Sequence, residues 1–138
     1  MKALLLILSI SIIYALIRAK HDSFISGGPW KKYAFIEGVL VAIVSVVAVV
    51  SLFGLNWWIG FPLGALFAFV FWLFFDCIVG WHFSGSILYI GNTGFDKLMR
   101  ETFKYNLPIF GWKSGALILI IFKSFWIALL ILIYNALL

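Results

Sequence analysis

Four long apolar stretches, separated by polar connections, constrain the fold of this 138-residue chain more than any other feature. They lie at about residues 3–17, 34–54, 57–80 and 115–138. A helix needs about 20 apolar residues, with a range of roughly 17–25, to cross a bilayer. Because 65% of the residues are hydrophobic and only 11% are charged, a soluble domain of this size has too little interior to bury them. The sequence therefore predicts an all-α fold, an integral membrane four-helix bundle.

The first stretch, residues 3–17, is slightly shorter than a usual span and follows Lys2. A basic start before an apolar core is also typical of a signal peptide. Arg18, however, places a charge where a cleavage site requires a small residue. We therefore expect the first helix to be retained.

Small residues recur at helical spacing in the second and third stretches. The predicted packing faces are Gly38, Ala42 and Ser45 in one stretch and Gly60, Gly64 and Ala68 in the other. Small side chains at steps of three or four share a helix face and let two helix backbones approach closely in a membrane. Only the short turn 55–56 separates the two stretches. They are therefore predicted to form a tight helical hairpin.

The longest connection, residues 81–114, contains an amphipathic pattern. Apolar residues recur at steps of three and four from Phe95 to Phe103, and charged residues occupy the opposite face. Thr93 is a suitable N-cap residue, and Pro108 ends the pattern. We predict an interfacial helix at about residues 94–105 that lies in the membrane surface instead of crossing it.

Basic residues gather in two of the connections. Four Lys or Arg residues lie between the first and second stretches and four between the third and fourth, whereas the turn 54–57 has none. Basic connections usually remain on the cytoplasmic side of a membrane. We therefore expect cytoplasmic polar connections and both termini outside, in a bacterial inner membrane. The expected partners are the lipid bilayer and its anionic headgroups, and the net charge of +5 does not indicate nucleic acid.

Two charged residues interrupt the apolar stretches themselves. Asp76 lies four residues before Gly80, and Lys123 lies nine residues after Ser114. At 1.5 Å per residue, the two positions are about 6 Å and about 13 Å from the same membrane face. Since a lysine side chain can extend back toward that face, we predict an Asp76–Lys123 pair. An ion pair that stabilises the bundle is the favoured interpretation, and an ion or proton pathway is the alternative.

Further ionisable residues gather at the predicted cytoplasmic rim. A candidate metal site there comprises His21, Asp22, Asp76, His82 and Asp96. Carboxylates and imidazoles bind divalent metals, but they can equally form a proton relay or act as acid and base on a lipid headgroup. The simpler interpretation is that polar residues collect at the rim because they are costly in the hydrocarbon core. The sequence has no metal-spaced or nucleophile motif and identifies no cofactor, so enzymatic activity is disfavoured.

Several short motifs carry a family resemblance. They are Phe75-Asp76 followed by Gly80, Tyr89-Ile90-Gly91-Asn92-Thr93, Phe95-Asp96, His21-Asp22, Gly28-x-Trp30-Lys31 and Trp57-Trp58. Over roughly residues 20 to 100, the pattern resembles small four-span membrane proteins of unknown function from Bacteroidota and their tailed phages. The resemblance implies that His21, Asp22, Asp76 and Asp96 recur as a set, and it implies no activity. Cys77 is a departure, because that pattern commonly has Asn or Arg there.

The sequence leaves three functions open. The favoured one is a scaffold or subunit of a homo- or hetero-oligomeric membrane assembly that packs through its small-residue faces. The second is an oligomeric pore, a holin-like channel or an ion transporter with Asp76 and Lys123 in the path. The third is a membrane enzyme or metal site at the His/Asp rim.

Overall fold

The computed structural model describes residues 1–24, 30–84 and 112–138 of the chain. Every regular element among these residues is a helix. The elements are α1 (Lys2–Phe24), α2 (Trp30–Leu52), the short 3₁₀ helix η1 (Trp57–Ile59), α3 (Gly60–Ser84) and α5 (Trp112–Leu137). The all-α class is therefore confirmed for the described part of the chain. The predicted interfacial helix at 94–105 lies outside it.

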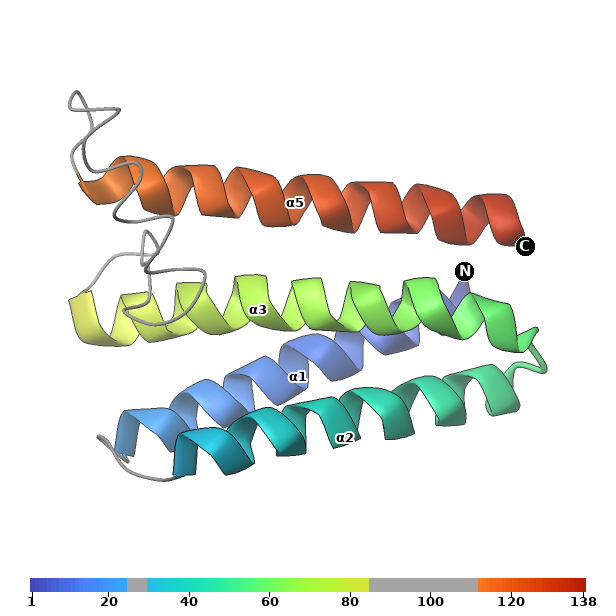
Figure 1. Ribbon diagram of the computed structural model, residues 1–138, viewed down its shortest axis with the longest axis horizontal. Helices are drawn as coiled ribbons and strands as arrows, with labels where there is room; N and C mark the ends of the chain where they lie inside the picture. Colours follow the sequence, from blue (N-terminus) through green and yellow to red (C-terminus); the bar gives the residue numbers. More distant parts are fainter. Residues whose placement is uncertain (25–29, 85–111) are drawn as a thin grey trace.

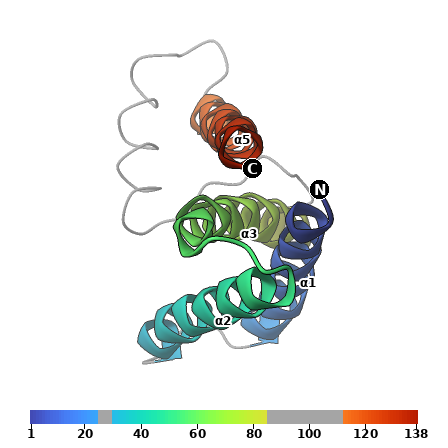
Figure 2. The ribbon, with the colours of Figure 1, turned by 90° about the vertical axis from the view of Figure 1, so that its right-hand side faces the viewer.

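The four long helices lie side by side and alternate in direction (Figure 1). Both chain ends and the turn between α2 and α3 lie at one end of the bundle, which we call the turn end. Helix α3 is central, since it packs against α1, α2 and α5. Figure 2 shows α5 on one side of α3 and the other two helices on the opposite side. The position of α3 explains why most interhelical contacts described below involve its residues.

Three helices contain segments long and apolar enough to cross a membrane. These segments are Lys2–His21, Trp57–His82 and Ala116–Leu137. In α2 the apolar segment found among the described residues is shorter, at Ile36–Leu52. Its 17 residues correspond to about 25 Å of helix, somewhat less than the thickness of a typical hydrocarbon core.

All four long helices extend beyond the apolar stretches that predict them. Helix α2 begins at Trp30, before the expected residue 34, and α5 begins at Trp112, before the expected residue 115. Helix α1 continues from the expected end at residue 17 to Phe24, and α3 continues past Gly80 to Ser84. The apolar pattern ends where the side chains become polar, but Arg and Lys are good helix formers and prolong α1. A single glycine such as Gly80 lowers helix stability without ending the helix.

The turn between α2 and α3 is built by two residues with specific backbone roles. Gly54 has a φ of 59°, and the following Leu55 N–H donates to Val50 O at 2.9 Å, which ends α2. Asn56 then accepts a hydrogen bond from Trp58 N at 3.2 Å and caps η1. The third predicted stretch therefore begins at Trp57 with a 3₁₀ turn that leads directly into α3.

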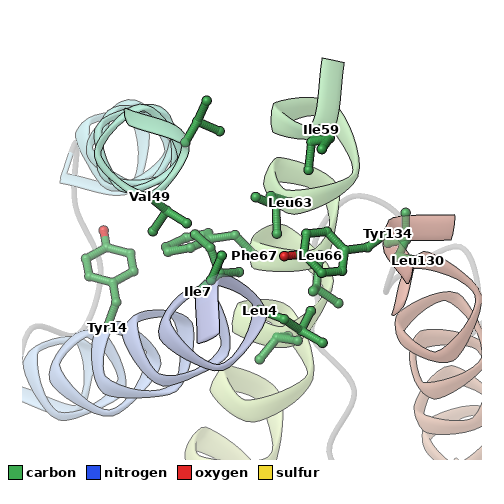
Figure 3. Close-up of a cluster of buried hydrophobic side chains, with 13 residues drawn as sticks. Leu4, Ile7, Tyr14, Val49, Ile59, Leu63, Leu66, Phe67, Leu130 and Tyr134 are labelled. Carbon is green, nitrogen blue, oxygen red and sulfur yellow. The ribbon is translucent and has the colours of Figure 1, made fainter. Parts of the chain in front are cut away.

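The apolar core lies where the helices meet around α3 (Figure 3). Its members come from α1, α2, η1, α3 and α5 and include Leu4, Ile7, Val49, Ile59, Leu63, Leu66, Phe67, Leu130 and Tyr134. Many large apolar side chains are also exposed on the outer surface, among them Ile17, Val44 and Leu132. A monomeric soluble protein rarely exposes large contiguous apolar patches, whereas a bilayer accommodates them.

Candidate functional site

A buried ion pair joins α3 to α5. The Lys123 Nζ donates a hydrogen bond to Asp76 Oδ2 and forms an ion pair with it. Only 1% of Lys123 and 7% of Asp76 is exposed. Asp76 lies eight residues before the end of α3 and Lys123 eleven residues after the start of α5, or about 12 Å and about 16 Å along the helices. The structure thus brings together the two residues that the sequence analysis paired, well inside the bundle.

An aromatic ring completes the surroundings of the ammonium group. The Lys123 Nζ lies 4.0 Å from the centroid of the Trp72 ring, one helical turn before Asp76. This distance is typical of a cation–π contact. The Lys123 charge therefore has a carboxylate and an aromatic face as partners.

A cluster of aromatic rings lies beside the ion pair at the α3–α5 interface. Phe69 stacks on Trp126 with ring centroids 5.9 Å apart, and it lies 6.4 Å from Phe122 and 6.3 Å from Trp72. These rings contribute apolar surroundings, in which an ion pair attracts more strongly than in water but costs more to desolvate. Loss of one charge would therefore leave the other charge buried without a counter-ion.

A second charged contact joins α1 to α2. Arg18 Nη1 lies 3.0 Å from Glu37 Oε2, and the Tyr14 hydroxyl donates to Glu37 Oε1 at 3.3 Å. The Tyr14 ring also packs on Phe71 of α3, with centroids 5.1 Å apart, so Tyr14 of α1 contacts both α2 and α3. The Arg18 side chain is 11% exposed and that of Glu37 51%. This contact is more exposed to solvent than the Asp76–Lys123 pair.

The sequence analysis did not predict the Arg18–Glu37 contact, although a signal was available. Residues at equal distances from a helical turn lie opposite one another in an antiparallel hairpin. Arg18 lies nine residues before Gly27, and Glu37 lies nine residues after Gly28. Opposite charges in such positions predict an interhelical pair.

The predicted metal site lies partly outside the described residues. His21 lies in the last turn of α1 and His82 in the last turn of α3, while Asp76 contacts Lys123. The side chains of Asp22 and Asp96 are not among those described. In the described part of the chain, no group of three or more His, Cys, Asp or Glu residues is arranged to hold a metal ion. The five-residue metal site stays a prediction.

The predicted small-residue faces contact different neighbours. A Cβ added at Gly60 would lie 3.3 Å from Val46 Cγ1 of α2, and one at Gly64 would lie 3.7 Å from Val46 Cγ2. Gly38 instead faces Tyr14 of α1, whose hydroxyl oxygen would lie 3.8 Å from an added Cβ. In the same two helices, Ser45 is buried and Ala68 is exposed. The α2–α3 hairpin therefore forms with Gly60 and Gly64 at its inner face.

An open apolar groove of about 560 Å³ lies between α2 and α3. Its lining includes the small residues Ala42, Gly60, Gly64 and Ala65. Phe61 also lines the groove, and it is 74% exposed. Helices α2 and α3 thus approach each other where Gly60 and Gly64 meet Val46. The groove is the space that remains between the two helices next to this contact.

Comparison of the chain with known protein families, with curated proteins and with solved structures finds no match. The resemblance to small four-span membrane proteins therefore stays a prediction. The features of the chain that bear on its function are the buried ion pair and the apolar groove.

Proposed function

We propose that this protein is a small polytopic membrane protein and a subunit of a homo-oligomeric membrane assembly. The α2–α3 groove is the surface that packs against a second copy of the chain. The observation that carries this proposal is the open apolar groove lined by small residues. No chemistry needs to be assigned to the Asp76–Lys123 pair, whose role here is structural.

The proposed bilayer position is supported by the exposed tryptophans of η1 and α3. Trp58 and Trp81 are 72% and 66% exposed and lie 23 residues apart in sequence. At 1.5 Å per residue they are separated by about 35 Å. Tryptophans prefer the two membrane–water interfaces, which flank a hydrocarbon core of about 30 Å. In this position α3 crosses the bilayer, and the Asp76–Lys123 pair lies within the hydrocarbon region.

The proposed orientation places the turn end of the bundle outside and the basic connections in the cytoplasm of a bacterium. Both termini lie at the turn end (Figure 1), and among the Lys and Arg residues of the described helices only Lys2 lies there. The charge distribution and the family resemblance both support this location. The basic residues at the opposite end are positioned to attract anionic lipid headgroups.

The chemistry of the groove supports a membrane-embedded occupant. The described residues that line it are uncharged, and its floor of glycine and alanine lets the backbone of another helix approach closely. The exposed side chain of Phe61 lies beside this floor, so the same surface contains both a bulky side chain and a groove. In a two-fold symmetric interface the same patch on both subunits must fit itself, and this patch has both features that such a fit requires. We therefore assign a second copy of the chain as the occupant.

Native mass spectrometry of the full chain released from lipid nanodiscs tests the proposal. We expect species at multiples of 15.6 kDa. Ala42→Leu fills the groove and should shift the distribution toward the monomer. Ala128→Leu makes the same change at an exposed position of α5 and should leave the distribution unchanged. A wild-type protein that stays monomeric at every protein-to-lipid ratio would refute the proposal.

A further inference from the structure

We infer that the Asp76–Lys123 pair sets the register in which α5 docks along α3. The buried residues of α5 form a single stripe on one helix face. They are Ala116, Leu119, Lys123, Leu130 and Tyr134, at steps of three, four, seven and four. Such spacing places all of them on the side that faces α3, as in the seam of a coiled coil. Lys123 lies in the middle of this seam.

Within the described part of the chain, α5 is positioned by its seam with α3. Among the described helices it packs chiefly against α3, and Figure 2 shows α3 between α5 and the other two long helices. In the sequence, 27 residues separate Ser84 from Trp112. By comparison, only four residues separate α2 from η1. Among the described residues, the register of α5 therefore depends on the side chains of this seam.

The apolar part of the seam discriminates weakly between registers. A slip of α5 by one helical turn, about 5.4 Å, would again place mostly apolar side chains of α5 against the apolar surface of α3. Apolar contacts of this kind are non-directional, so the slipped arrangement loses little.

The charged residues discriminate strongly between registers of α5, because each charge occurs once in the seam. Asp76 is the sole Asp, Glu, Lys or Arg of α3, and Lys123 is the sole such residue of α5 after Lys113. A one-turn slip moves the ammonium group away from both the Asp76 carboxylate and the Trp72 ring. A single polar residue in an apolar helix seam is known to fix register at some cost in stability. The pair therefore selects one docking position.

A register role makes a different prediction from a purely stabilising role. Replacing both residues by apolar ones, Asp76→Leu with Lys123→Met, removes the charges and their desolvation cost together. Such replacements of buried pairs are often neutral or stabilising. We expect the double variant to stay folded but to populate more than one α3–α5 register.

The test measures distances between spin labels on the two helices. Labels at Ala68→Cys and Leu117→Cys, in a Cys77→Ala background, lie eight and six residues from the ion pair on opposite sides of it. Their separation along the bundle is about 21 Å, and a one-turn slip changes it by about 5 Å. Both positions are exposed, and an excess of unlabelled protein suppresses distances between subunits.

We expect one distance with the native pair and a second or broadened distance in the double apolar variant. The charge-swapped variant Asp76→Lys with Lys123→Asp retains one cation and one anion, so it should give the single distance again. A double apolar variant with the single native distance would overturn the inference. Loss of folding in that variant would overturn it too, because the pair would then hold the helices together instead of choosing their register. Either result leaves the groove-mediated assembly untouched.

Discussion

Reversing one charge of the Asp76–Lys123 pair should be far more damaging than reversing both. The variant Asp76→Lys places a second ammonium group beside Lys123, where the native pair is almost fully buried. Lys123 lies about 16 Å from the start of α5, and a lysine stem can reach back only several ångströms toward water. Neither cation can therefore escape from the interface without moving α5.

The magnitude follows from the burial of the pair. Breaking a buried ion pair by removing one partner costs about 3–5 kcal/mol, which is roughly a 100- to 4,000-fold change in the ratio of folded to unfolded protein. The swapped variant Asp76→Lys with Lys123→Asp restores opposite charges. It should recover most of the lost free energy of unfolding. About 0.5–2 kcal/mol would stay lost if the ammonium group no longer lies over the Trp72 ring.

The assay is reversible unfolding of the purified protein in detergent micelles or bicelles, analysed as a double-mutant cycle. The two single reversals, Asp76→Lys and Lys123→Asp, should each unfold much more readily than the double reversal. A double variant no better folded than either single would refute the reasoning, because it would show that the two charges do not stabilise each other.

Three further perturbations follow from the contacts described above. Trp72→Leu removes the ring over Lys123 and should lower the unfolding free energy by about 0.5–2 kcal/mol, whereas Trp72→Phe should retain part of it in the same unfolding assay. Arg18→Ala should cost at most about 1 kcal/mol, since its partner Glu37 is half exposed, and added salt should reduce the difference from wild type in a thermal melt. Gly54→Ala forces a Cβ into a backbone with a φ of 59° and should cost about 1–2 kcal/mol; Gly54→Asn should be milder, and equal melting temperatures for the two would contradict this account.

The Asp76–Lys123 contact could be predicted from the sequence because the choices are few. Each residue is an isolated charge in a long apolar stretch, and a charge in such surroundings needs a partner. Counting residues from the expected helix ends places them about 6 Å and about 13 Å from the same face, a difference that the long lysine side chain can bridge. The Trp72 ring was not predicted, because aromatic residues are too frequent in this chain for one of them to be singled out.

The arrangement of the helices was harder to predict than their existence. Gly60 and Gly64 predict that another helix backbone comes close. They do not fix the angle between α2 and α3, so the groove could not be inferred. The central position of α3 was also missed, since every helix is apolar on most of its faces. In a soluble protein, one apolar face would have indicated the direction of the core. In a chain whose helices are apolar on most of their faces, that signal is lost.

The most direct measurement of the central claim, that the α2–α3 groove packs against a second copy, is disulfide cross-linking in native membranes. Ile43 lines the groove and is 54% exposed, whereas Leu132 is 66% exposed on α5, away from it. In a Cys77→Ala background, Ile43→Cys should yield a species of twice the 15.6 kDa of the chain on oxidation, and Leu132→Cys should stay at 15.6 kDa. Equal cross-linking at both positions, or none at Ile43→Cys, would contradict the account.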